Sequence, residues 1–179
     1  QVLNVKQQKI LDEALSDITY ELDSFISKEK IKDIKIKRYR ELWINIYGSI
    51  NKNILVNFRK KILAEIASVE IKQQKKWQKI DMKKISDGFL IEIRKIIEKE
   101  LEKLWSLERA ALWKFLNSNI DKKEYIVWSI DWLIVNITRH FGYAVRKIVE
   151  EKGYHLEDYW STYEVDQKAK IHAMINEIF

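Results

Sequence analysis

The sequence predicts an all-α protein, with long amphipathic basic helices in the N-terminal half followed by a C-terminal helical bundle. Its 179 residues contain no proline and only four glycines, the residues on which tight turns between strands depend. Apolar residues recur every three or four positions along most of the chain, the spacing of one helix face. Hydrophobic residues make up 46% of the chain, so a chain of this length can bury a substantial core.

The first two predicted helices cover residues 2–27 and 28–50. In the first, apolar side chains alternate with Asp and Glu at near-helical spacing, which is typical of an amphipathic helix. In the second, apolar side chains from Ile36 to Ile50 step by three and four residues. The alternation of Ile and Lys within residues 28–38 also fits a short strand, so both structures stay open for that stretch.

The middle of the chain is expected to hold a turn, two helices and a loop. "YGSINKN" at 47–53 is the best turn candidate of the first half. A helix follows over about 54–80, and another over about 85–116, each with one apolar face. The stretch "NSNIDKKE" at 117–124 is expected to be a loop in which Asp121 caps the next helix.

The fifth helix is predicted to run to Lys152 and to stop at Gly153, because glycine commonly ends a helix. A last helix is predicted over about 163–179, with Ser161 as its N-cap and Glu164 as the reciprocal partner.

Positive charge is concentrated in one part of the chain. Residues 28–84 hold 17 Lys and Arg against six Asp and Glu, an excess of 11, whereas the whole chain carries +6. Residues 86–179 hold 14 basic and 16 acidic residues and five of the seven tryptophans. We therefore predict a basic helical region over 1–84 and a helical bundle over 85–179 that packs and assembles.

The segment "VEIKQQKKWQKIDMKK" carries a row of lysines with no acid inside it. On a helix the lysines would follow one another along one face, where like charges repel. A polyanion converts this repulsion into binding through the release of counterions. Nucleic acid is therefore the expected partner, with an anionic membrane surface, an acidic protein or a solvated face as alternatives. The row consists of Lys72, Lys75, Lys76, Lys79 and Lys83.

The sequence argues against catalysis, and neither a cofactor nor a metal is expected. Without cysteine there are no disulfides, thiolate ligands or Cys nucleophiles. His140, His155 and His172 are not spaced to form a site on one helix, and His140 is expected to be packed or hydrogen-bonded. Paired carboxylates such as Glu98 and Glu102 could act as acid and base. A solvated charge lattice is the simpler expectation because of the nearby cations Arg94, Lys95, Lys99 and Lys103.

Two further features have alternative interpretations. Trp128 and Trp132 lie four residues apart, which fits packing in a core or a subunit interface, or else a platform for stacking bases. The most apolar segment, 125–137, is interrupted by Asp131 and is shorter than the roughly 20 residues that span a bilayer. No transmembrane helix is therefore expected, and the N-terminus lacks the pattern of a signal peptide.

Long basic helices with almost no glycine or proline, followed by an aromatic helical bundle, resemble the major coat proteins of filamentous viruses of hyperthermophilic archaea. The resemblance covers the whole chain and lies in architecture and charge. It implies that two related subunits form a helix-rich dimer that wraps double-stranded DNA inside a filament. It also implies that the C-terminal bundle makes subunit contacts. The residues that it would place on phosphates are Lys35, Lys37, Arg38, Arg40, Arg59, Lys60, Lys61 and the lysine row.

We therefore expect a structural protein that binds double-stranded DNA along its backbone without sequence preference and assembles with itself or a related subunit. Lysine provides a point charge rather than the bidentate geometry that reads bases. The expected location is the virion, with a soluble intracellular pool before assembly. The alternative is a small helical inhibitor or interaction protein that binds an acidic partner.

Overall fold

The computed structural model describes residues 3–26, 37–71, 80–154 and 167–178, and the secondary structure within them is α-helix without strands. The all-α prediction is therefore confirmed. The described helices are α1 (Val5–Ile26), α3 (Lys37–Ile71), α4 (Met82–Glu102), α5 (Ser106–Ser118), α6 (Ile120–Glu151) and α7 (Lys168–Ile178).

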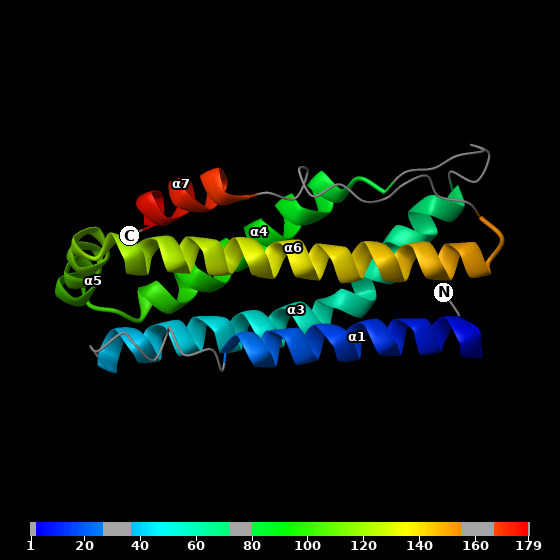
Figure 1. Cartoon of the computed structure of the whole chain (residues 1–179), viewed down its shortest axis with the longest axis horizontal. Coiled ribbons are helices and arrows are strands. Elements are labelled where there is room, and N and C mark those ends of the chain that lie inside the picture. Colours follow the sequence, from blue (N-terminus) through cyan, green and yellow to red (C-terminus); the bar gives the residue numbers. More distant parts are fainter. Residues whose placement is uncertain (1–2, 27–36, 72–79, 155–166, 179) are drawn as a thin grey trace.

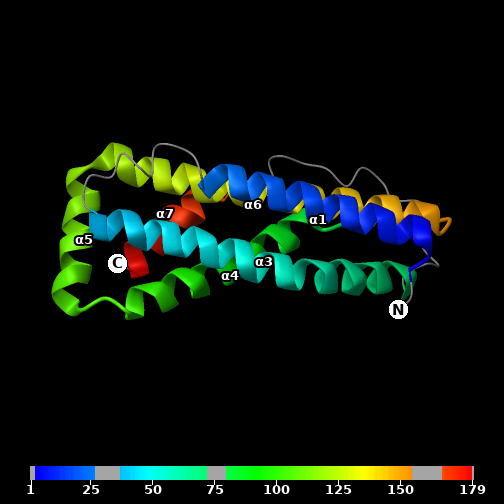
Figure 2. The ribbon, with the colours of Figure 1, turned by 90° about the horizontal axis from the view of Figure 1, so that it is seen from below.

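The four long helices form two layers. α1 and α6 form one layer, and α3 and α4 form the other layer, packed against it (Figures 1 and 2). The short helix α5 crosses one end of the bundle, and α7 lies along α6 near that end and also contacts α4 (Figure 1). No helix among the described residues is both long and apolar enough to cross a membrane.

One hydrophobic core joins helices from both halves of the chain. Phe141 of α6 packs edge-on against Phe58 of α3, with ring centroids 5.7 Å apart. It packs in the same way against Phe89 of α4 at 6.1 Å. The predicted boundary near residue 84 therefore separates stretches of different charge that share this core. The proposed division of labour between 1–84 and 85–179 stays a prediction.

The turn predicted at 47–53 is wrong, because α3 is continuous from Lys37 to Ile71. Trp43, Tyr47 and Ile54 belong to one buried stripe that passes through this stretch. Burial of such side chains stabilises each by about 1.5–3 kcal/mol, more than the roughly 1 kcal/mol that a glycine costs inside a helix. Residues 27–36 lie outside the described part, so the choice between helix and strand there stays open.

The helix predicted over 85–116 is two helices, because α4 ends at Glu102 and α5 begins at Ser106. Glu108 supports the start of α5 by accepting a hydrogen bond from the N–H of Trp105 at 3.2 Å. The loop predicted at 117–124 is also wrong. Asn119 alone separates α5 from α6, and its N–H bonds to Leu116 while its carbonyl accepts from Lys123.

The predicted end of the fifth helix is confirmed. α6 ends at Glu151, and Gly153 follows with a left-handed φ of 92°. The N–H groups of Gly153 and Tyr154 donate to Glu150 and Val149 at 3.0 Å each, the paired bonds of a Schellman motif. The last helix is confirmed, but α7 begins at Lys168, after the non-helical Gln167, and not at residue 163. The predicted cap at Ser161 lies outside the described residues.

Candidate nucleic-acid interface

The structure describes seven of the twelve predicted DNA-binding side chains. Lys35, Lys72, Lys75, Lys76 and Lys79 lie outside the described residues. Six of the seven are on α3 and one is at the start of α4. They are Lys37, Arg38, Arg40, Arg59, Lys60, Lys61 and Lys83.

Arg38 joins two helices of the bundle. Its Nε donates to Glu108 Oε2 at 2.7 Å, which links α3 to the start of α5. This hydrogen bond, together with the one from the N–H of Trp105, lowers the pKa of the Glu108 carboxyl. The Arg38 side chain is 56% exposed, so its outer part stays open to solvent while its charge already has a partner.

Lys61 also has an internal partner. Its ammonium group pairs with Glu92 of α4 and lies 4.6 Å from the centre of the Phe89 ring. Only 32% of the side chain is exposed. Lys61 therefore holds α3 against α4, and it contributes less free charge to the surface than its neighbour in sequence, Lys60.

The other five side chains are more loosely held. Lys37 is 3.9 Å from Glu41, and Arg59 donates to Gln8 of α1 at 3.3 Å. Lys60 and Lys83 are exposed, and Arg40 is half-buried. None of these last three forms an ion pair with a residue that the structure describes. Lys83 lies near enough to Asp87 to help lower the pKa of that carboxyl, so Arg40 and Lys60 are the predicted cations whose charge is most available to a ligand.

A second set of cations, which the sequence did not assign to binding, lines a groove between α3 and α4. The groove has a volume of about 480 Å³ and is lined from α3 by Ser49, Lys52 and Asn53. From α4 it is lined by Lys95, Ile96, Lys99 and Glu100, and from the C-cap of α4 by Lys103. A smaller hollow of about 110 Å³ shares Glu100 and Lys103 and adds Arg38. We call the larger hollow the α3–α4 groove.

The i, i+4, i+8 spacing of Lys95, Lys99 and Lys103 was the available sequence signal for this groove. From the sequence alone a solvated charge lattice is the simpler expectation, because acids are interspersed along the same helix. The structure pairs Glu98 with Arg94 at 2.7 Å, away from this lysine row. It also brings Lys52, 43 or more residues earlier in the chain, to the same groove, which no local spacing could indicate.

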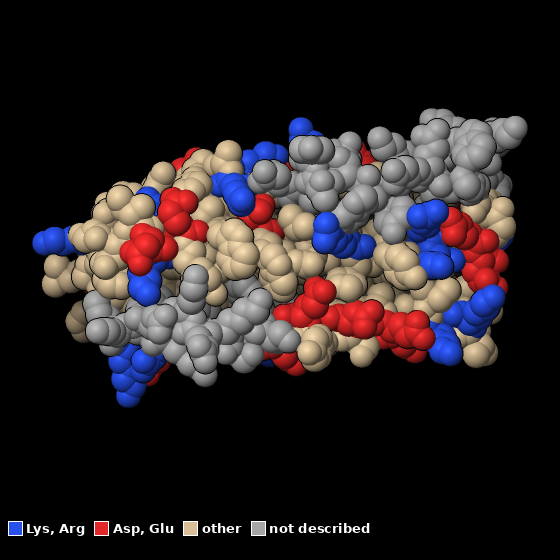
Figure 3. All heavy atoms as spheres, in the orientation of Figure 1, with Lys and Arg blue, Asp and Glu red and all other residues tan. Residues whose placement is uncertain are grey.

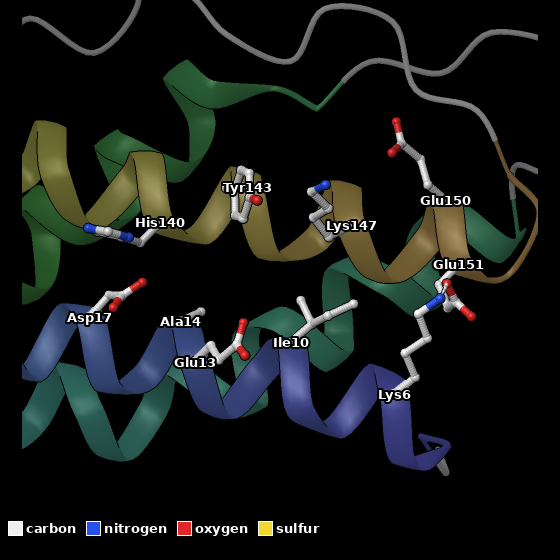
Figure 4. Close-up of a pocket in the computed structure, with 10 residues that line it drawn as sticks. All are labelled: Lys6, Ile10, Glu13, Ala14, Asp17, His140, Tyr143, Lys147, Glu150 and Glu151. Atoms are coloured by element: carbon white, nitrogen blue, oxygen red, sulfur yellow. Dashed lines mark ion pairs between the residues drawn. The ribbon is translucent and has the colours of Figure 1, made fainter.

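The α1–α6 pocket, in the other layer, has a volume of about 550 Å³ and mixed charge. Figure 4 shows side chains of α1 along one side and of α6 along the other, with Lys6 and Glu151 meeting at one end. That ion pair measures 3.1 Å. Acidic side chains gather over α1 on this face (Figure 3). The pocket wall itself includes Glu13 and Asp17 of α1. Such a surface is less suited to a polyanion than the α3–α4 groove.

The described histidines make contacts that fit a structural role. His140 lines the α1–α6 pocket, and its Nε2 lies 2.9 Å from Glu21 Oε1. His172 Nε2 lies 3.3 Å from Glu124 Oε2, and His155 is outside the described part. Within the described ranges, no group of three or more His, Asp or Glu side chains could hold a metal ion.

Trp128 is 43% exposed, and its ring centroid lies 5.9 Å from that of Tyr125. Trp132 is half-buried against the core. The intermediate exposure of Trp128 is compatible with a subunit contact and with a stacking platform, so both interpretations stay open.

Comparison of the chain with models of protein families, with curated proteins and with solved structures finds no match. Any assignment of function therefore depends on the charges and contacts of the chain itself.

Proposed function

We propose that this protein binds the sugar–phosphate backbone of double-stranded DNA without sequence preference and assembles on it as a structural, coat-like protein. The observation that carries the proposal is the excess of 11 positive charges over residues 28–84, in which Arg40, Lys60 and Lys83 have no ion-pair partner among the described residues. Cations without internal partners can neutralise DNA phosphates, and the release of the counterions condensed on the DNA then favours binding.

The kinds of cation favour backbone contact over base reading. Lysines outnumber arginines in residues 28–84 by 14 to three. The lysine ammonium is a point charge with freely rotating donors, whereas base recognition depends on the bidentate geometry of Arg, Asn or Gln. Arg38, which could supply such geometry, is engaged by Glu108. Contacts between lysines and backbone phosphates position DNA without reading its sequence.

Exposed apolar side chains around α5 support the assembly part of the proposal. Trp105 is 79% exposed, Leu107 83% and Ile120 66%. All three lie at the end of the bundle that α5 closes (Figure 1). Trp105 and Leu107 lie two residues apart at the start of α5, and neighbouring exposed apolar side chains commonly mark a contact between proteins. A second copy, or a related subunit, would cover this end in a filament.

The test compares two duplexes of equal length and unrelated sequence, with the wild-type protein and a variant in which Lys72, Lys75, Lys76 and Lys79 are changed to Gln. The proposal predicts equal affinities for the two duplexes and a much weaker affinity in the variant. A strong preference for one sequence would contradict backbone binding. Absence of binding to either duplex at low salt would favour the alternative, an interaction protein with an acidic partner.

A further inference from the structure

The exposed side of α4 carries a row of like charges. Lys95, Lys99 and Lys103 follow one another at four-residue spacing, which places successive Cα atoms about 6 Å apart along the helix axis. Like charges at this spacing destabilise a helix. Lys52 of α3 adds a fourth ammonium group from the other side of the α3–α4 groove. Four cations therefore converge on one hollow.

The acid in the groove does not neutralise this set. Glu100 is 8% exposed, and its Oε1 accepts from Lys103 Nζ at 3.0 Å and from Ser49 Oγ at 3.4 Å. Its charge is thus balanced by Lys103. Lys52, Lys95 and Lys99 are exposed and form no ion pair with a described residue. Three positive charges remain for a ligand.

We propose that the α3–α4 groove binds phosphates of the nucleic-acid backbone, through Lys52, Lys95 and Lys99. This inference rests on the proposed function and extends it. It places part of the binding surface on α4, beyond residue 84, in the half of the chain expected only to pack and assemble. Lys95 and Lys99 of α4 and the basic helix α3 then bind the same ligand.

The size of the groove suits a stretch of backbone. The eight residue steps from Lys95 to Lys103, the C-cap of α4, rise about 12 Å along the helix axis, which corresponds to three or four nucleotide steps of about 3.4 Å in one strand. A volume of about 480 Å³ accommodates several phosphate groups with their water. The charged lining consists of lysine and glutamate without arginine, so the groove holds charge and does not read bases.

A second copy of the chain is the competing occupant. The acidic side chains over α1 (Figure 3) could meet the lysines of the groove in a head-to-tail contact. DNA is favoured because its charge density, one phosphate per about 1.7 Å of duplex, matches a linear row of cations. The face over α1 also carries lysines such as Lys6 and Lys147, which would oppose docking against the groove.

The test uses the full chain with the triple substitution K52Q, K95Q and K99Q, and a matched control that removes the same charge elsewhere. The control is K9Q, K114Q and K122Q, on α1, α5 and α6, none of which lines the groove. Binding of a labelled random-sequence duplex is followed by fluorescence anisotropy across a salt series. Thermal unfolding of both variants checks folding, and relief of like-charge repulsion is expected to leave the melting temperature of the groove variant unchanged or raised.

The inference predicts that the groove substitutions make the slope of log K against log salt shallower by two to three, at about 0.9 per phosphate contact. The control is expected to change the slope by less than one. Equal slopes for the two variants would overturn the inference while leaving the proposed function standing. Absence of binding by the wild-type protein would instead overturn the proposed function and the inference with it.

A second readout locates the contact directly. DNA is expected to protect Lys52, Lys95 and Lys99 from acetylation, measured by mass spectrometry, and to leave Lys9 and Lys114 reactive. Protection of the control lysines to the same extent would contradict a groove-specific site. If protein concentration alone protects the groove lysines, and sedimentation shows that the groove variant no longer self-associates, the occupant is a second copy and the proposal is wrong.

Discussion

The backbone N–H of Gln167 donates to Asp131 Oδ1 at 2.8 Å, in a site where both residues are buried. The same glutamine uses its side-chain amide to reach Ser86 Oγ and Asp87 Oδ1, each at 2.9 Å. Asp131, which lies inside the most apolar segment of the chain, thus fixes the position of Gln167, the residue that precedes α7. Three separate parts of the sequence meet here, and α7 is held against α4 and α6 by this network as well as by its apolar face.

Replacing Asp131 with Ala is expected to destabilise the fold by about 1–3 kcal/mol, because it leaves the buried N–H of Gln167 without an acceptor. Asp131→Asn keeps an acceptor oxygen and is expected to cost less. Chemical denaturation measures both, and hydrogen exchange of α7 amides shows where protection is lost. Equal stability of the alanine variant and the wild-type protein would contradict this role.

Asp87 gives the same region a pH dependence. Partial burial opposes its ionisation, but hydrogen bonds from Lys170 at 2.7 Å and from Gln167 outweigh that effect and lower its pKa. A carboxyl whose folded pKa is lowered stabilises the fold above its unfolded pKa of about 3.9, and the contribution is lost as the pH falls through the folded pKa. Asp87→Asn is therefore expected to destabilise the protein at pH 7 by less than about 1 kcal/mol.

The difference between Asp87→Asn and the wild-type protein should shrink as the pH falls below about 3.9 and through the lowered pKa of Asp87, below which both side chains are neutral. Urea denaturation at a series of pH values measures it. A difference that grows toward low pH would show that the sign is wrong.

Substitution with alanine is expected to have opposite effects on stability at Gly153 and Gly48. Gly153→Ala is expected to destabilise the protein by about 1–2 kcal/mol, because a side chain is strained at its φ of 92°. Gly48→Ala is the control, since Gly48 lies inside α3 and an added Cβ would meet nothing within 4 Å. There alanine is expected to stabilise by about 0.5–1 kcal/mol. Thermal unfolding distinguishes the two, and a stabilised Gly153→Ala protein would contradict the described end of α6.

Lys60 and Lys61 are adjacent in sequence but are expected to respond differently to substitution with Gln. Lys60→Gln should make the salt slope of DNA binding shallower by about 0.9 and leave stability within about 0.5 kcal/mol. Lys61→Gln should lower stability by about 1 kcal/mol, because the ion pair with Glu92 and the contact with the Phe89 ring are lost. Its effect on the salt slope of DNA binding should be smaller. Anisotropy and denaturation on the same two proteins check this, and interchanged results would refute the assignment.

The helical class was predictable because apolar spacing and the scarcity of glycine and proline act locally along the chain. The ends of the helices were harder. At Gly48 the local preference for a turn is overridden by burial of Trp43, Tyr47 and Ile54 on one stripe of α3. At Asn119 one residue serves both as the end of α5 and as the start of α6, whereas its polar neighbours suggested a longer loop.

The candidate site was only partly predictable for a related reason. The charge excess of residues 28–84 is a property of composition and can be counted. Which cations have internal partners depends on contacts between helices, such as Arg38 with Glu108 and Lys61 with Glu92. The approach of Lys52 to the lysines of α4 depends on how α3 packs against α4. Neither the ion pairs between helices nor the approach of Lys52 can be predicted from the spacing of residues along one helix.

The most direct test of the central claim is the affinity of the wild-type protein for a random-sequence duplex, measured from about 50 to 200 mM salt. Backbone binding through the basic surface predicts a straight line of log K against log salt with a slope of about −4 or steeper, as expected for at least four neutralised phosphates. A slope near zero, or no binding at the lowest salt, would contradict the claim that this protein is built to hold nucleic acid.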